Sequence, residues 1–146
     1  MSMFCYQCQE TAKGTGCTIA GVCGKKENTA NLQDLLVFAL KGIAVVAVEA
    51  QKQGKLDNTT GLFICQSLFA TITNANFDDS RITALIKEAF AKRDALKLAT
   101  AFTGTQDCVA WNGSEAEFAA KAQEVGVLSQ PNEDVRSLRE LLIYGL

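Results

Sequence analysis

Four cysteines within a short stretch near the N-terminus constrain this chain more than any other feature. Cys5, Cys8, Cys17 and Cys23 follow the pattern C-x2-C-x8-C-x5-C, with four glycines among them. Neither helical nor strand periodicity runs through residues 1–28. Glycine permits close approach of the backbone, which a loop wrapped around a compact inorganic centre requires. We therefore expect residues 1–28 to form a cysteine-rich segment that holds a metal centre.

The absence of histidine narrows the possible ligands. None of the 146 residues is a histidine, which excludes catalytic triads, zinc sites with histidine ligands, Rieske centres and haem bound through histidine. A disulfide scaffold is also disfavoured, because 48% of the residues are apolar and a chain of this size does not need cross-links. Clustered thiols without an export signal instead favour a metal site.

Two kinds of metal centre remain, and the spacing favours one of them. Structural zinc sites typically use two C-x2–4-C pairs. Here only Cys5 and Cys8 form such a pair, whereas Cys17 and Cys23 come singly. Single ligands from a winding loop suit a larger cubane, whose iron corners face different directions. The spacing thus favours an iron–sulfur cluster and leaves zinc and disulfides as alternatives. A cubane with four thiolate ligands has no iron site open to substrate, so we expect it to function in electron transfer.

Other residues near the thiols suggest supporting roles. Lys13, Lys25 and Lys26 would stabilise the reduced form of such a cluster or dock an electron donor protein, and the alternative is that they are solvated surface lysines. Cys65 lies in an apolar helical stripe and is predicted to be a buried core thiol. The role of Cys108 stays open.

Charge and hydropathy exclude several partners. The chain has 14 basic and 16 acidic residues, which gives no electrostatic footprint for nucleic acid and no polybasic patch for a membrane. The first residues lack the basic and apolar regions of a secretory signal. The apolar run Leu35–Val48 contains Lys41 and is too short to cross a bilayer. We expect a cytoplasmic protein.

The rest of the chain predicts an all-α helical bundle. The pattern indicates helices over residues 31–53, 60–75 and 79–100, and the apolar stretch Leu35–Val48 is typical of a central, buried helix. Ser114 and Glu117 form a capping box that opens a further helix, and Asn132 is a candidate N-cap for a last one. The helix over 60–75 carries an apolar stripe made of Leu62, Cys65, Phe69 and Ile72.

An internal similarity connects the first and last of these helices. Residues 31–40 (NLQDLLVFAL) match residues 137–146 (SLRELLIYGL), so that Asp34 corresponds to Glu140 and four leucines correspond to Leu138, Leu141, Leu142 and Leu146. The second copy stops in mid-pattern, which leaves its apolar face unpaired. We expect a helical bundle over 29–130, followed at 131–146 by the start of a second, truncated bundle whose leucines favour self-association. The alternative is a true C-terminus.

The order of these motifs resembles a known family. The opening MFCYQCQETAKGTGCTIAGVCGK, the following KENTANLQDLL, and the later FATITNANFDDSRI and DVRSLRELLIYGL are similar to the start of hybrid-cluster (prismane) proteins, also called hydroxylamine reductases. The resemblance covers essentially the whole chain. It implies that Cys5, Cys8, Cys17 and Cys23 ligate a [4Fe–4S] cluster. It also implies a helical first domain built from two three-helix bundles.

The same resemblance implies a function for the complete enzyme. The family reduces hydroxylamine to ammonia, and nitric oxide reduction is also attributed to it, at a hybrid iron–sulfur–oxygen cluster with His, Glu and Cys ligands in later domains. This chain has no histidine, so we expect an electron-transfer domain without catalytic residues, which works with an electron donor protein and the remaining domains. The alternative is a zinc or helical interaction module without redox activity.

Overall fold

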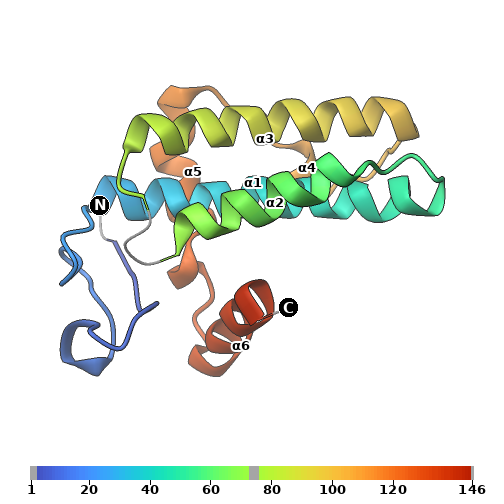
Figure 1. Cartoon of the computed structure of the whole chain (residues 1–146). Helices are drawn as coiled ribbons and strands as arrows, with labels where there is room; N and C mark the ends of the chain where they lie inside the picture. The colour runs from blue at the N-terminus through green and yellow to red at the C-terminus, as the bar shows by residue number, and fades with distance from the viewer. Residues whose placement is uncertain (1–2, 73–75, 146) are drawn as a thin grey trace.

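The computed structural model describes residues 3–72 and 76–145, and its fold is all-α, as predicted. An irregular segment precedes the helices and lies at one end of the bundle (Figure 1). Apart from three short 3-10 turns, the regular elements of these two ranges are the α-helices α1 (Glu27–Lys52), α2 (Asn58–Thr71), α3 (Asp79–Thr100), α4 (Asp107–Ala110), α5 (Phe118–Val125) and α6 (Glu133–Gly145).

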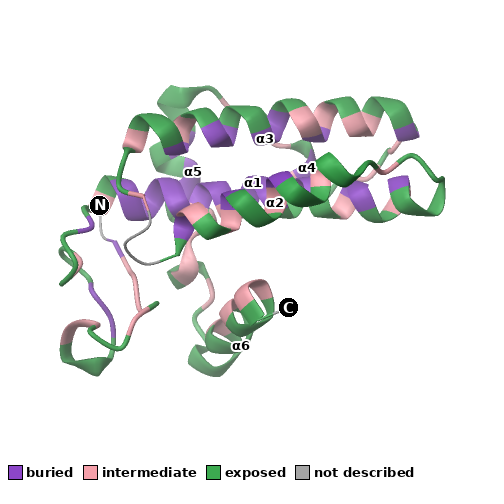
Figure 2. Cartoon of the chain, in the orientation of Figure 1, coloured by how far each residue is buried: buried purple, intermediate pink, exposed green. Residues whose placement is uncertain are grey.

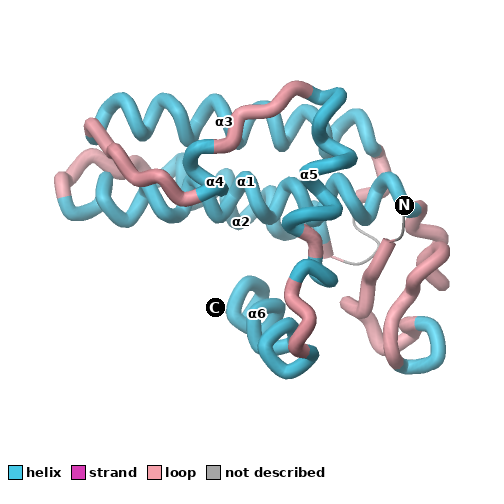
Figure 3. The backbone as a smooth tube through the Cα atoms, turned by 180° about the vertical axis from the view of Figure 1, so that it is seen from behind, coloured by secondary structure: helices cyan, strands magenta, loops and turns pink. Residues whose placement is uncertain are grey.

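Helix α1 is the centre of the bundle. It packs along α3 and also contacts α2, α4 and α5, so that other helices surround it in the front and back views (Figures 1 and 3). Leu35, Ile43 and Val46 are fully buried, and the burial colouring follows α1 through the core (Figure 2). The prediction of a central helix from the run Leu35–Val48 is therefore confirmed.

The apolar composition of α1 has a second consequence. By length and composition alone this helix could cross a membrane, since an 18-residue window has a mean hydropathy of 1.7. However, 67% of that window is buried inside the protein. The position of α1 in the core is sufficient to explain why its residues are apolar.

Several helix ends follow the predicted signals. Gly54 (φ 65°) ends α1, and the Lys55 amide donates to the Ala50 carbonyl at 2.8 Å, as glycine-terminated helices commonly do. The Ser114 amide donates to the Glu117 carboxylate at 2.8 Å, which confirms the capping box before α5. The start of α1 lies at Glu27, four residues before the predicted one, because Lys26 makes no side-chain cap that the sequence could reveal.

The predicted inner face of α2 is wrong. Cys65 is exposed rather than a core thiol, and Leu62 and Phe69 are 57% and 68% exposed. The helix instead buries Phe63 and the polar positions Ser67 and Thr71. Because α2 carries apolar residues of its own on most of its faces, the periodicity of its sequence does not identify the face that packs against the core. The end of the predicted helix, 73–75, lies outside the described residues.

Helix α6 repeats the pattern of α1 in a different environment. The Val135 amide donates to the Asn132 side chain at 3.0 Å, which confirms Asn132 as the N-cap. Leu138, Leu141 and Leu142 are 60 to 67% exposed, whereas the matching leucines of α1 are buried. Leu146, the last residue of the internal similarity, lies outside the described residues. The boundaries of the predicted bundles stay a prediction.

Candidate metal centre

The N-terminal segment holds two of the predicted ligands side by side. Cys5 and Cys17 form an isolated antiparallel bridge, in which the Cys5 amide donates to the Cys17 carbonyl at 3.1 Å and the Cys17 amide donates to the Cys5 carbonyl at 2.8 Å. Gly16, next to Cys17, leaves space for the Phe4 ring, which a Cβ atom at this position would overlap. The segment therefore pairs the backbones of two predicted ligands through this single bridge, with one 3-10 turn (Ala12–Gly14) between them.

The sulfur of Cys17 lies among hydrogen-bond donors. Cys17 is only 4% exposed, the Ala12 amide donates to its sulfur at 3.4 Å, and the Thr11 hydroxyl lies 3.6 Å from it. The Ala12 amide, and after it the Val22 amide, lower the pKa of the Cys17 thiol. Donors that stabilise a thiolate are what a metal-binding cysteine needs.

The sulfur of Cys5 lies beside a buried cation. Lys25 is 1% exposed, and its ammonium nitrogen is 3.6 Å from the Cys5 sulfur and 3.3 Å from the Gln7 side-chain oxygen. The reading of Lys25 as a solvated surface lysine is thus wrong, although Lys13 and Lys26 are exposed. No ion pair in the described part of the chain includes Lys25. A buried ammonium group needs a compensating anion, and a thiolate at Cys5 can supply it.

Cys8 and Cys23 lie in the same segment but are less enclosed. Cys8 is half-buried and Cys23 is exposed, and within residues 3–72 and 76–145 no hydrogen bond or disulfide joins either to the other thiols. A Cβ atom at Gly21 would lie 3.0 Å from the Cys23 sulfur, so glycine there leaves space beside this thiol. Cys65 and Cys108 lie on α2 and α4, away from the segment. All six cysteines are free.

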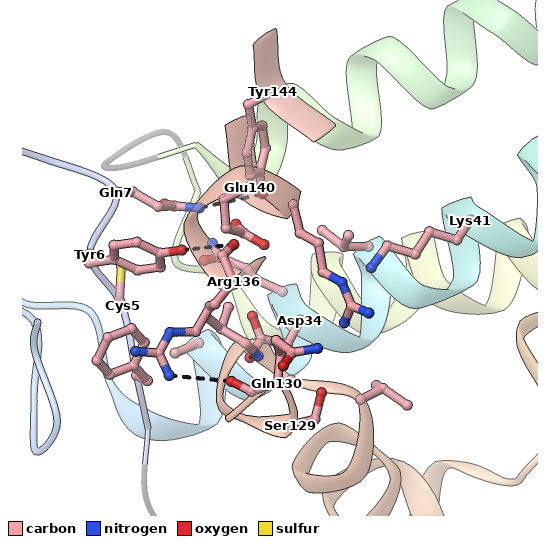
Figure 4. A pocket seen from close by; sticks show the side chains of 18 of the residues that line it. Cys5, Tyr6, Gln7, Asp34, Lys41, Ser129, Gln130, Arg136, Glu140 and Tyr144 are labelled. Atoms are coloured by element: carbon pink, nitrogen blue, oxygen red, sulfur yellow. Dashed lines mark hydrogen bonds between the residues drawn. The ribbon is translucent and has the colours of Figure 1, made fainter. Parts of the chain in front are cut away.

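A polar cavity that sequence reasoning missed lies next to the cysteines. It encloses about 60 Å³ between the N-terminal segment, α1, α6 and the turn at 126–130 (Figure 4). Cys5 and Asp34 share its wall with four residues of α6, which are Arg136, Arg139, Glu140 and Tyr144. The one signal in the sequence was the internal similarity, because Asp34 and Glu140 occupy corresponding positions within two apolar patterns.

Hydrogen bonds fix α6 against the rest of the molecule at this cavity. The Tyr144 hydroxyl lies 2.8 Å from the Thr71 hydroxyl on α2, and the Gln7 side-chain nitrogen Nε2 donates to the Tyr144 hydroxyl oxygen at 3.4 Å. The Tyr6 hydroxyl donates to the Arg136 carbonyl, also at 3.4 Å. These bonds join α6 to α2 and to the N-terminal segment, two parts of the chain that are distant from α6 in sequence.

Burial changes the acidity of the cavity residues. It raises the pKa of Asp34 to about 7, with Glu140 raising it further, while the Val127 amide and the cations Lys25 and Lys41 act in the opposite direction. Burial also raises the pKa of Glu140, and it raises the pKa of Tyr144 to about 12. Burial thus favours the neutral, protonated forms of the Asp34 and Glu140 carboxyl groups.

The fold and the site together define a class of protein, a helical bundle that carries a thiol-rich segment at its N-terminal end. The chain belongs to the Prismane/CO dehydrogenase family, which it matches over residues 3–146. This finding confirms the resemblance to hybrid-cluster proteins that the sequence motifs indicated.

Similar proteins are considerably longer than this chain. A hydroxylamine reductase of Desulfitobacterium hafniense is 54% identical over 153 residues, which cover 100% of this chain and 28% of that protein. The hydroxylamine reductases of Nitratidesulfovibrio vulgaris and Bacteroides thetaiotaomicron are 52% and 51% identical, over 99% and 100% of this chain and 28% and 27% of their own lengths. The chain spans just over a quarter of the length of the curated relatives it matches.

Proposed function

We propose that this chain is the electron-transfer domain of a hydroxylamine reductase and that Cys5, Cys8, Cys17 and Cys23 hold its [4Fe–4S] cluster. The observation that carries the proposal is the surroundings of two thiols: amide donors at the Cys17 sulfur and the buried Lys25 at the Cys5 sulfur. Both stabilise negative charge on sulfur, as cluster ligands require. The names of the relatives support the activity of the complete enzyme.

The spacing of the thiols supports a cluster rather than a single ion. A zinc ion binds sulfur at about 2.3 Å, so its ligands must converge on one point. In this chain only Cys5 and Cys8 form a closely spaced pair, whereas Cys17 and Cys23 follow singly along the loop. Thiols that project from separate points of one loop can instead each meet a different corner of a cubane.

The bound cluster would supply one-electron transfer. With four cysteine ligands it leaves no iron open to substrate, so reduction of hydroxylamine, or of nitric oxide, falls to a hybrid cluster in the remaining domains of a full-length enzyme. Within this chain, the Ala12 amide and Lys25 favour the added electron, because they place positive charge beside the ligand sulfurs. A donor protein can approach at the exposed Cys23. Six free thiols are consistent with the reducing cytoplasm.

The test is anaerobic reconstitution with iron and sulfide, followed by absorption and EPR spectra and by counting of iron and zinc in the same sample. We expect about four irons per chain and an EPR signal in the reduced state. Stoichiometric zinc that persists after reconstitution, with no visible absorption band, would instead support a structural module without redox activity.

A further inference from the structure

The cavity beside the cysteines is lined by a carboxyl group, that of Asp34, whose few contacts do not explain why an acid is placed there. Asp34 accepts only one hydrogen bond in the described part of the chain, from the Val127 amide at 3.3 Å, and it forms no ion pair there. A carboxylate in such surroundings is costly unless it is paired or protonated. Asp34 is half-buried, with the half-buried Val37 and the exposed Lys41 on the same face of α1, and it lines the cavity rather than the packed apolar core.

The cavity also offers a route for protons. Its volume of about 60 Å³ has room for a few waters, each of which needs about 10–15 Å³, and its walls provide polar partners. The side chains that face Asp34 across it include cations, an acid and phenols. They are Cys5, Tyr6 and Lys25 from the N-terminal segment, Lys41 from α1, and Arg136, Arg139, Glu140 and Tyr144 from α6, while the turn at 126–130 offers polar but no titratable groups.

Asp34 and the cysteine segment are coupled through shared charges. Lys25 contacts the Cys5 sulfur, and the same cation lowers the pKa of Asp34. Charges on both Cys5 and Asp34 raise the pKa of Tyr144, so the two groups act over the same short range. Negative charge added at the cysteines is therefore felt at Asp34.

We propose, on the basis of the function above, that Asp34 is a proton-binding site that takes up a proton from solvent when the metal centre at Cys5, Cys8, Cys17 and Cys23 accepts an electron. One electron enters from a one-electron reductant, and one proton adds to a carboxylate oxygen of Asp34. The carboxylate becomes a neutral carboxyl group, so the net charge of the buried region does not change. Glu140, the matching acid of α6, faces the same cavity and makes the neutral form of Asp34 more favourable.

The sign of the effect on the reduction potential follows from this linkage. At low pH Asp34 is already neutral and does not oppose the electron. As the pH rises through about 7, Asp34 ionises in the oxidised protein, and its negative charge then opposes reduction unless a proton is bound. The reduction potential must therefore fall as the pH rises across this range.

The experiment is a potentiometric titration of the reconstituted protein, followed by EPR, at pH values between about 5 and 9, which bracket the ordinary and raised pKa values of a carboxyl group. We expect the potential of the unchanged protein to fall with rising pH near neutrality. Asp34→Asn should remove this dependence and hold the potential near the value that the unchanged protein has at low pH. Glu88→Gln, which alters an exposed carboxylate on α3, should retain the dependence.

A second measurement needs no variant. Infrared difference spectra between reduced and oxidised protein at slightly alkaline pH should show a gained band of a protonated carboxyl group that shifts in heavy water. Absence of that band, a potential that does not depend on pH, or a dependence that survives in Asp34→Asn would each overturn the proton site alone. A protein that binds no iron after reconstitution would overturn the proposed function and the proton site with it.

Discussion

The ammonium nitrogen of Lys25 lies 3.6 Å from the sulfur of Cys5 in the described structure, and Lys25 is almost fully buried. A flexible, strongly hydrated side chain has thus been removed from water and placed against a predicted cluster ligand. Because the same cation also acts on Asp34, Lys25 connects Cys5 with the polar cavity that Asp34 lines. The relationship gives the N-terminal segment a fixed positive charge that its near-neutral composition does not reveal.

Replacing this cation should lower the reduction potential of the reconstituted protein. In Lys25→Met the apolar stem is kept but the positive charge beside Cys5 is lost, so added negative charge is less stabilised. We expect a fall on the order of tens of millivolts by potentiometric titration. Lys26→Met alters the exposed neighbour and should change the potential far less. Equal shifts in the two variants would contradict a specific role for Lys25.

Single cysteine replacements separate ligands from bystanders. Cys17→Ser removes a thiol that three nearby donors surround, so the reconstituted protein should lose most of its iron. Cys65→Ser changes an exposed thiol on α2 and should retain about four irons per chain. Iron counting and the visible spectrum measure both. Full iron content in Cys17→Ser, or loss of iron in Cys65→Ser, would count against the assigned ligand set.

The two faces of α2 can be distinguished by stability. Phe63 is 8% exposed and packs in the core, so Phe63→Ala should lower the free energy of unfolding by about 3 kcal/mol. Phe69 is 68% exposed, and Phe69→Ala should change it by less than about 0.5 kcal/mol. Urea denaturation of both variants provides the measurement. A larger loss in Phe69→Ala would restore the face that periodicity first indicated.

Structural features that are set by contacts within a few residues could be predicted from the sequence, whereas features that depend on distant neighbours could not. The end of α1 at Gly54 and the capping box at Ser114 follow from contacts within a few residues, and both were predictable. The inner face of α2 depends on which neighbour it meets, and nothing within the helix decides that. The start of α1 was misplaced because Lys26 provides no capping side chain.

The candidate site shows the same division. The spacing of the four cysteines is a local property, and it is enough to propose a ligand set, which stays a prediction. The cavity forms only when α6 meets the N-terminal segment, so the partnership of Asp34 with Glu140 could not be read from spacing. Likewise, the burial of Lys25 results from the fold of the whole segment, whereas a lysine in a polar loop is ordinarily exposed.

Two glycines in helix interiors should respond in opposite ways to alanine. At Gly42 on α1, an added Cβ would overlap the carbonyl oxygen of Cys108 and approach Arg93 at 3.1 Å, so Gly42→Ala should destabilise the protein by about 1–3 kcal/mol. At Gly61 on α2 nothing lies within 4 Å, so Gly61→Ala should stabilise it by roughly 0.5–1 kcal/mol. Chemical denaturation measures the change in the free energy of unfolding for each variant. If Gly42→Ala stabilised the protein, α1 and α4 would not pack as closely as the structure shows.

The raised pKa of Asp34 predicts how stability depends on pH. The folded protein holds the Asp34 proton up to about pH 7, whereas the unfolded chain releases it near pH 4, so stability should fall as the pH rises between these values, by at most roughly 1.4 kcal/mol per pH unit from this group. Glu140, whose pKa is also raised, adds to the same trend. Carboxylates with lowered pKa values, such as Asp57 and Asp78, act in the opposite direction but at lower pH.

Urea denaturation at a series of pH values tests this dependence without any need for bound iron. Asp34→Asn should flatten the fall in stability between about pH 5 and pH 7 and should make the protein more stable than the unchanged chain above neutrality, because no buried carboxylate then has to ionise. Glu88→Gln on α3 should leave the pH profile as it is. If Asp34→Asn retained the full dependence, Asp34 would have to be ionised in the folded protein near pH 5, and its surroundings would then be far more polar than a cavity of about 60 Å³ beneath α6 allows.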